Sequence, residues 1–119
     1  MSEGDLRQSL EKINSPRILV VGDLMLDHYS WGEVDRISPE APIPVMRVLR
    51  EDQRLGGAGN VVMNLAAFGA EVLVCGVTGK DETGKCIRKL LAENGVDHSG
   101  VIISENYKSC LKHRMIAGQ

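Results

Sequence analysis

The chain has 119 residues, of which 43% are hydrophobic and 25% are charged, and its formal net charge is −2. This length fits one modest globular domain or a portion of a larger one. The slight acidity and the four aromatic residues exclude a strongly basic, base-stacking surface, so we expect no nucleic-acid partner.

The N-terminal residues lack the apolar segment of a secretory signal, and no apolar run approaches the roughly 20 residues that span a bilayer. We therefore expect a cytoplasmic protein with no membrane partner. The cysteines and histidines are scattered, without C-x-x-C or other metal-ligand spacing, which predicts free thiols and no metal site. They are Cys75, Cys86, Cys110, His28, His98 and His113.

In the first half of the chain, the pattern predicts a short surface helix over residues 5–13. Residues 17–22, RILVVG, form a continuous apolar run that is typical of a strand buried on both faces. Residues 33–44 are polar and hold three prolines, so they are expected to be a connection, and residues 43–51 alternate like an exposed strand. The region of about 28–51 is therefore expected to be a small β flap added to a core.

In the second half, residues 61–68 are apolar on nearly every side and predict a helix pressed against a sheet. Residues 71–77 predict a second buried strand, and residues 81–94 predict an amphipathic helix. Residues 100–104 and 110–118 can supply further strands. This alternation of strands and helices indicates an α/β fold with a mostly parallel sheet covered by helices.

Ligands of such sheets bind beyond the carboxyl ends of the strands, so residues 23–27 and 56–60 are expected to face a site. The glycines Gly56, Gly57 and Gly59 suggest a close approach to the backbone or a positive φ. The alternative interpretation is a tight turn followed by a helix cap.

Two strings resemble nucleotide-binding motifs, and neither fits well. GAGNVV, starting at Gly57, lacks the third glycine of G-x-G-x-x-G, and EDQRL before it makes a poor strand. GKDETGKC has Cys86 where a P-loop needs a hydroxyl, and Asp81 and Glu82 would repel phosphate. A plain helix N-terminus explains the second string, although a P-loop phosphotransferase remains an alternative in which Lys85 binds nucleotide.

The residues that remain suit a polyhydroxylated ligand. Asp27 offers fixed hydrogen-bond acceptors, Asn60 both donates and accepts, and the glycine backbone lets N–H groups approach a sugar. The alternative role for Asp27 is that of a turn residue or cap.

VVGDLMLDHY followed by GGAGNVVMNLAAFGAEVLVCGVTGKDETG resembles the N-terminal half of the ribokinase-like (phosphofructokinase B type) carbohydrate kinases. The resemblance covers residues 17 to about 96. It implies that residues 1–119 are the N-terminal portion of one ribokinase-like domain, in which Asp27, Gly56, Gly57 and Asn60 bind the sugar. It also implies ATP and Mg²⁺ as cofactors. The catalytic base, in a G-A-G-D-like motif, belongs to the C-terminal half of the family and has no counterpart here, so no catalytic residue is expected in this chain.

A narrower resemblance comes from RISPEAPIPVMRV, residues 36–48. It is similar to kinases that phosphorylate D-glycero-D-manno-heptose 7-phosphate at O1, a step toward the heptose of the lipopolysaccharide core. In the resembling family such flaps pair between subunits, which implies a homodimer. The alternatives are an inert sugar-binding or dimerising fragment, or a ribokinase-like kinase for another sugar.

The string KHR adds one further hypothesis. Lys112 and Arg114 point to the same face of a strand, because side chains alternate with a period of two. Most such pairs are merely solvated. The functional alternative is that one or both contact the 7-phosphate of the substrate, since arginine grips phosphate with two hydrogen bonds.

Overall fold

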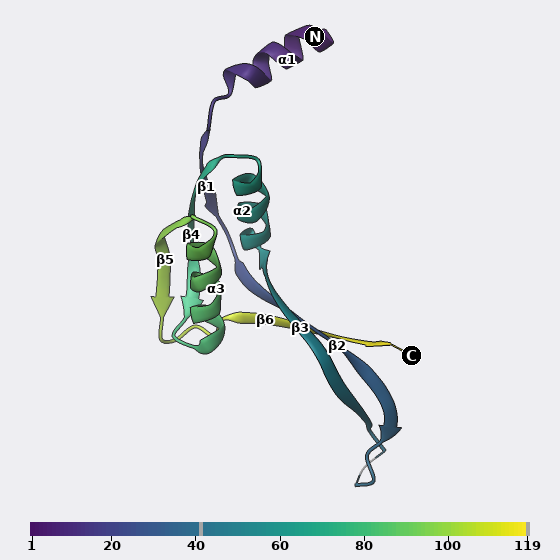
Figure 1. Ribbon diagram of the computed structural model, residues 1–119. Helices are drawn as coiled ribbons and strands as arrows, with labels where there is room; N and C mark the ends of the chain where they lie inside the picture. Colours follow the sequence, from purple (N-terminus) through teal and green to yellow (C-terminus); the bar gives the residue numbers. More distant parts are fainter. Residues whose placement is uncertain (41, 119) are drawn as a thin grey trace.

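The computed structural model describes residues 1–40 and 42–118, and the side chains of residues 35 and 36 lie outside that description. Three helices and six strands alternate along the described chain (Figure 1). In order they are α1 (Glu3–Lys12), β1 (Arg17–Val21), β2 (Leu24–Ile37), β3 (Pro44–Gly57), α2 (Ala58–Ala67), β4 (Glu71–Gly79), α3 (Glu82–Glu93), β5 (Asp97–Ser104) and β6 (Cys110–Gly118).

The first sheet is the parallel unit that the sequence predicts. Its strand order is β1-β4-β5. The chain passes through β2, β3 and α2 between β1 and β4, and through α3 between β4 and β5. Connections between parallel strands are right-handed. When successive strands are added in one direction across a sheet, such connections place their helices on the same face of it. Accordingly Val72 and Val74 of β4 are buried against the helices, whereas Leu19 and Val21 of β1 are exposed. The expectation that β1 is buried on both faces is therefore wrong for this chain.

The second sheet has the order β3-β2-β6 and carries a long antiparallel hairpin. β6 pairs with β2 in parallel. The connection expected over residues 33–44 is shorter than predicted, because β2 continues to Ile37 and β3 begins at Pro44. The backbone hydrogen bonds between the two strands outweigh the polar composition, and Pro44 stands at the first position of its strand, where proline is tolerated.

The strand β3 is also longer than the sequence predicts. It runs through residues 51–55, which were expected to be a poor strand, and ends at Gly57. β3 lies at the edge of its sheet, so its charged side chains reach solvent without disturbing the pairing with β2. A glycine-rich segment thus joins a strand directly to α2.

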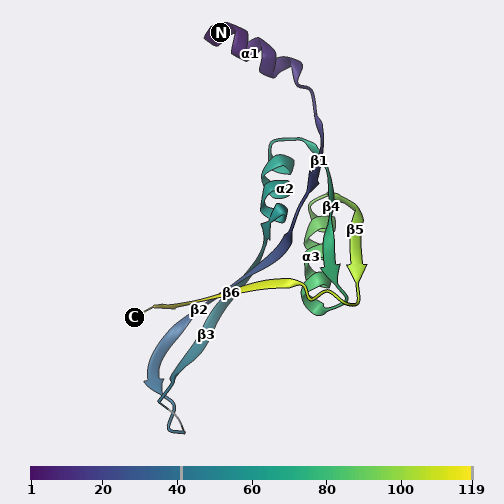
Figure 2. The same ribbon diagram turned by 180° about the vertical axis from the view of Figure 1, so that it is seen from behind.

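One hydrophobic core joins the two sheets. Leu24 and Leu26 of β2 and Leu55 of β3 pack with side chains from both helices, including the fully buried Val62 and Ile87. The near end of the hairpin is therefore anchored in the core. Its far end extends away from the helices (Figures 1 and 2).

The helix α1 begins two residues earlier than the expected surface helix, because Ser2 and Asp5 form a capping box. The hydroxyl of Ser2 accepts a hydrogen bond from the Asp5 N–H, and the Asp5 carboxylate accepts one from the Ser2 N–H. None of its residues is buried, and it projects from the rest of the molecule (Figure 1).

The helix α3 is fixed at its start by Asp81. One carboxylate oxygen accepts a hydrogen bond from Gly84 N at 2.7 Å, and the other accepts one from Ser109 N at 2.9 Å. The Ser109 N–H, followed by that of Gly84, lowers the pKa of Asp81 from its ordinary value. Asp81 therefore ties the helix to the segment that leads into β6.

We predict that Asp81→Ala lowers the free energy of unfolding by about 1–2 kcal/mol, because the helix loses its N-cap and the Ser109 N–H loses its acceptor. A lowered pKa means that this contribution is present above about pH 4 and is lost as the pH falls through the lowered value. Urea unfolding of the purified protein at pH 7 and pH 3 measures both effects. Glu82→Ala, which removes an exposed carboxylate one residue later, is the control. A difference between wild type and Asp81→Ala that is the same at both pH values would contradict this role.

Candidate functional site

The sheet β3-β2-β6 has two faces, and one of them gathers most of the predicted site residues. Strand register places side chains of the three strands side by side in four rows. We call this surface the Asp27 face. Its rows are Met25, Gly56 and Cys110; Asp27, Arg54 and Lys112; Tyr29, Asp52 and Arg114; and Trp31, Arg50 and Ile116.

The carboxylate of Asp27 lies against the backbone of Gly56. A β-carbon at residue 56 would stand 2.8 Å from Asp27 Oδ2. The other oxygen, Oδ1, is buried and has no hydrogen-bond partner among the described residues. Arg54 and Lys112 flank Asp27 in the register, yet neither forms an ion pair with it in the described part of the chain. A buried acceptor without a partner costs about 1–3 kcal/mol, so this oxygen is suited to accept a hydrogen bond from a ligand.

The two segments that were expected to face a site do come together. The carbonyl oxygen of Asp23 accepts a hydrogen bond from Ala58 N at 2.8 Å. Gly57 has a φ of 58°, and a β-carbon there would lie 2.5 Å from the same carbonyl oxygen. Both proposed reasons for the glycines are thus confirmed: Gly57 has a positive φ, and Gly56 is closely approached, by the Asp27 carboxylate. The alternative interpretation also holds in part, because Gly57 is the N-cap of α2.

Asn60 lies on the exposed first turn of α2. It lines a pocket of about 260 Å³ together with Arg54, Met63 and Leu90. No hydrogen bond links Asn60 to Asp27 in the described residues, but Arg54 borders both, since it pairs with Asp27 across the strands. Arg54 therefore lies between the two polar groups predicted to bind sugar.

Lys112 and Arg114 share the Asp27 face, as the alternation in β6 predicts. Both are exposed, and neither forms an ion pair with any described residue. The guanidinium carbon of Arg114 lies 5.8 Å from the centre of the Tyr29 ring. The cations thus stand one row apart, with Lys112 beside Asp27 and Arg114 beside Tyr29.

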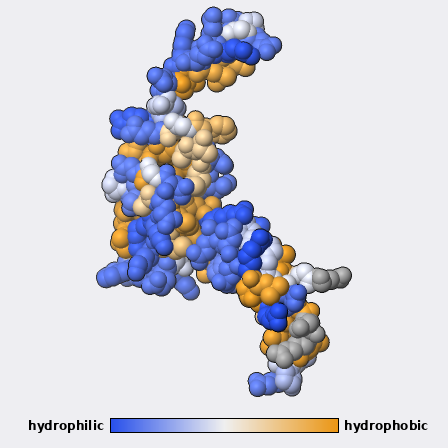
Figure 3. Space-filling view, viewed as in Figure 1, coloured by the Kyte–Doolittle hydropathy of each residue, from blue (hydrophilic) through white to orange (hydrophobic). Residues whose placement is uncertain are grey.

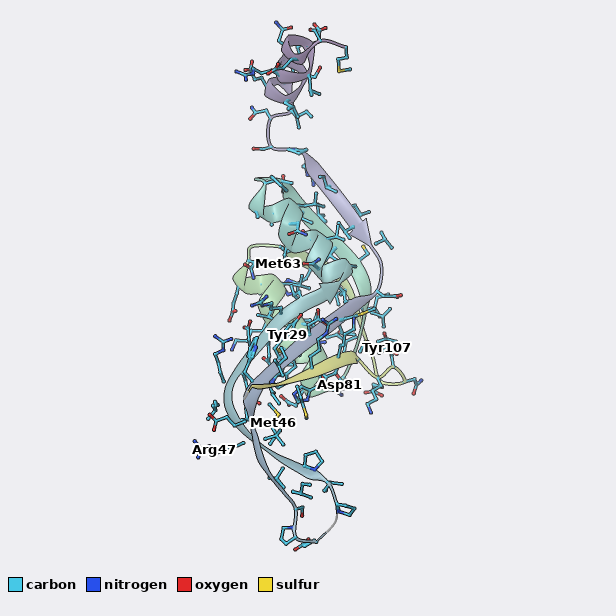
Figure 4. The ribbon with its side chains drawn as sticks, turned by 90° about the vertical axis from the view of Figure 1, so that its right-hand side faces the viewer. Tyr29, Met46, Arg47, Met63, Asp81 and Tyr107 are labelled. Carbon is cyan, nitrogen blue, oxygen red and sulfur yellow. The ribbon has the colours of Figure 1, made fainter. Side chains whose placement is uncertain are left out.

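Sequence reasoning missed Arg54, Tyr29 and Asp52. The guanidinium carbon of Arg54 lies 5.4 Å from the centre of the Tyr29 ring, on the opposite side of β2 from the strand of Arg114. Arg54 Nε also donates to Asp52 Oδ2 at 2.7 Å. Figure 4 shows Tyr29 where the three strands run together. The sequence shows only that residues 52, 54 and 56 would share one face of a strand. That this face lies beside Asp27 and Tyr29 follows from the register with β2.

The opposite face of this sheet brings together two histidines that the sequence leaves far apart. The rings of His28 and His113 stack with their centres 4.4 Å apart, and His113 Nε2 lies 2.8 Å from Ser30 Oγ. His28 Nε2 is 3.4 Å from Glu51 Oε1, at an angle that makes no hydrogen bond. The description of the histidines as scattered is therefore wrong for this pair. No group of three metal-ligating side chains occurs among the described residues.

Beside the histidine pair lies a pocket of about 400 Å³ between α3 and the sheet. We call it the α3 pocket, and it is lined in part by His28, Gln53, Lys85, Cys86 and Lys89. All three cysteines of the chain are free, as expected. No helix in residues 1–40 or 42–118 is long and apolar enough to cross a membrane.

The P-loop alternative fails on the geometry of α3. The backbone N–H of Gly84, which would be free to bind phosphate in such a loop, donates instead to the Asp81 carboxylate. Gly79 N donates to Ser109 Oγ at 2.7 Å. The start of α3 is therefore filled by the protein's own acceptors.

Comparison with known proteins agrees with this fold. The chain is 51% identical over 109 residues to a protein of Bordetella bronchiseptica named D-beta-D-heptose 7-phosphate kinase, covering 92% of this chain and 34% of that protein. It is 50% identical over 117 residues to the bifunctional protein HldE of Citrifermentans bemidjiense, covering 98% of this chain and 24% of that protein. The chain thus spans about a quarter to a third of these relatives.

Solved structures give the same result. A putative ribokinase from Agrobacterium tumefaciens superposes with a TM-score of 0.67 at 25% identity, covering 87% of this chain and 33% of that one. A fructokinase from Xylella fastidiosa superposes with a TM-score of 0.64 at 26% identity, covering 84% and 28%. The ribokinase-like fold expected from the sequence is confirmed. The model of the pfkB family of carbohydrate kinases matches residues 15–119, and the chain belongs to that family.

Proposed function

We propose that this chain is the sugar-binding part of an ATP-dependent kinase that phosphorylates D-glycero-D-manno-heptose 7-phosphate at O1. The relatives named heptose 7-phosphate kinase and HldE support the choice of substrate. The observation that carries the proposal is the buried Oδ1 of Asp27, which has no partner in the described residues and lies in one row with Arg54 and Lys112. Such an oxygen suits a sugar hydroxyl.

The sugar ring would lie beside the Asp27 carboxylate, which would accept hydrogen bonds from its hydroxyls. The absence of a side chain at Gly56 makes room for this carboxylate, since a β-carbon there would stand 2.8 Å from Asp27 Oδ2. Asn60, exposed at the start of α2, would both donate to and accept from hydroxyls. Lys112 and Arg114 would bind the 7-phosphate, since both cations are exposed on the same face without an anionic partner among the described residues.

ATP, Mg²⁺ and the catalytic base belong, in this proposal, to segments outside this sequence. The described residues contain no group of three potential metal ligands, and Asp81 fills the start of α3. Phosphoryl transfer needs positioned phosphates, a metal and a group that orients the nucleophile. We therefore expect the 119-residue chain alone to have no kinase turnover. The proposed location of the complete enzyme is the cytoplasm, and the proposed product is a precursor of lipopolysaccharide core heptose.

The apolar face of the first sheet fits the same proposal. Leu19, Val21 and Ile102 are exposed there, although strands of parallel sheets are normally covered on both faces. In the complete kinase, further segments would cover this face.

We predict that Asp27→Asn in the complete kinase weakens heptose 7-phosphate binding by roughly 10-fold to 150-fold, which corresponds to a hydrogen bond to a charged group. Stability should stay the same or rise, because the buried Oδ1 of Asp27 has no hydrogen-bond partner among the described residues that the substitution would remove. Calorimetric titration without ATP gives the affinity, and urea unfolding gives the stability.

Asp97→Asn is the matched control, because the Asp97 carboxylate accepts hydrogen bonds from Ser99 only and lies at the start of β5. Unchanged sugar affinity in a folded Asp27→Asn protein would refute the assignment. Lost stability with unchanged affinity would make Asp27 a structural residue.

We also propose that the kinase is a homodimer that pairs through the hairpin of β2 and β3. The far part of this hairpin leaves apolar side chains exposed (Figure 3). They are Val34, Ile37, Ile43, Val48 and Leu49. A two-stranded hairpin has too little core to bury such side chains by itself, so a second copy would cover them.

The expected result for Val48→Asp is a shift from dimer to monomer, because the new charge would be buried in the interface. Val48 is 47% exposed in the single chain, so the fold of the monomer should not change. Light scattering of the complete kinase at micromolar concentration measures the mass. Val61→Asp, at a 49% exposed valine on α2, should remain dimeric. A monomeric wild type, or a dimeric Val48→Asp variant, argues against this interface.

A further inference from the structure

Two arginines approach Tyr29 from opposite sides of β2. Arg54 comes from β3 and Arg114 from β6, the two strands that flank β2 in the sheet. Their guanidinium carbons lie 5.4 Å and 5.8 Å from the centre of the Tyr29 ring. Two cations from distant parts of the sequence therefore interact with one aromatic ring of the Asp27 face.

Arg54 is oriented for a further ligand. Its Nε donates to Asp52 Oδ2 at 2.7 Å, which fixes the plane of the guanidinium. The two terminal nitrogens of Arg54 have no hydrogen-bond partner among the described residues. A guanidinium held in this way presents two parallel N–H donors, and that geometry matches two oxygens of a phosphate.

The spacing along the strand fits a sugar phosphate. Asp27 and Tyr29 are two residues apart on β2, which places their rows about 6.7 Å apart. In a heptose 7-phosphate, four single bonds of roughly 1.5 Å connect ring carbon C5 to phosphorus, an extended arm of about 5 Å. A ring whose hydroxyls reach Asp27 therefore brings its phosphate to the row of Tyr29.

We propose that Arg54 binds the 7-phosphate of the substrate opposite Arg114, with Tyr29 and Asp52 as the residues that position it. This inference rests on the proposed function, because it needs heptose 7-phosphate as the ligand. It adds Arg54 of β3 to Lys112 and Arg114 of β6 as a residue that selects for the 7-phosphate. The same subsite distinguishes a phosphorylated from an unphosphorylated sugar, since only the phosphorylated sugar offers an anion to the terminal nitrogens of Arg54, which have no partner among the described residues.

The test compares two ligands of the complete kinase by titration calorimetry in the absence of ATP: heptose 7-phosphate and unphosphorylated heptose. Arg54→Gln should weaken binding of the phosphorylated sugar by roughly 10-fold to 100-fold, the range of a lost charge-assisted hydrogen bond. Binding of unphosphorylated heptose should change by less than about twofold. The loss should be larger at low salt, because the interaction is between charges.

Arg50→Gln is the matched control. Arg50 lies on the same strand and the same face, two rows farther along, with its guanidinium carbon 4.0 Å from the centre of the Trp31 ring. It should leave both affinities unchanged. Equal weakening of both sugars by Arg54→Gln, or no weakening of either, would overturn the role of Arg54.

Arg114→Gln separates this inference from the proposed function. If Arg114→Gln weakens only the phosphorylated sugar and Arg54→Gln does not, the proposed function stands and the role of Arg54 is wrong. If the wild-type kinase binds both sugars equally, or binds neither, the phosphate subsite and the proposed substrate both fail.

Discussion

The carboxylate of Asp27 occupies space that any side chain at residue 56 would need. This contact requires glycine at position 56, and the carboxylate forms no ion pair with the cations that flank Asp27 in the described part of the sheet. An ion pair with Arg54 or Lys112 would satisfy the acid and leave nothing for a ligand. The position of the carboxylate against Gly56 therefore leaves an acceptor unpaired within the described residues, at the place where two chain segments meet.

The strand β2 builds both the core and the site. Because its side chains alternate, Leu24 and Leu26 pack into the core while Asp27 and Tyr29 lie on the opposite face. The buried leucines hold the strand at the end where Asp27 stands, and the hairpin continues outward from there (Figure 2). A site on a strand anchored in this way needs little further support, since packing of the core fixes its backbone.

The charges on the Asp27 face are arranged in order along the strands. The row of Asp27 offers an acceptor for hydroxyls. Arg54 from this row and Arg114 from the next row both approach the aromatic ring of Tyr29. A sugar phosphate has the same order, with hydroxyls on its ring and a dianion at the end of its arm. The opposite face of the sheet carries stacked histidines and a hydroxyl instead, and it offers no comparable series of cations along β6.

The order of apolar and polar residues was sufficient to predict the parallel sheet β1-β4-β5 and its helices, because each of these elements has its pattern within about a dozen residues. It was also sufficient for Gly56 and Gly57, where a cluster of glycines has few explanations other than backbone conformation or close approach. The hairpin was underestimated because its stability comes from pairing between strands and not from composition. Arg54 and the histidine pair were missed for the same reason: their neighbours are set by register across strands, which no single stretch of sequence contains.

The most direct test of the sugar site is a crystal structure of the complete kinase with heptose 7-phosphate bound. We expect a sugar hydroxyl within hydrogen-bond distance of Asp27 Oδ1, with the ring beside the Asp27 carboxylate and the phosphate at the row of Tyr29. A sugar bound in the α3 pocket on the opposite face, or an Asp27 carboxylate satisfied by another part of the protein, would contradict the assignment.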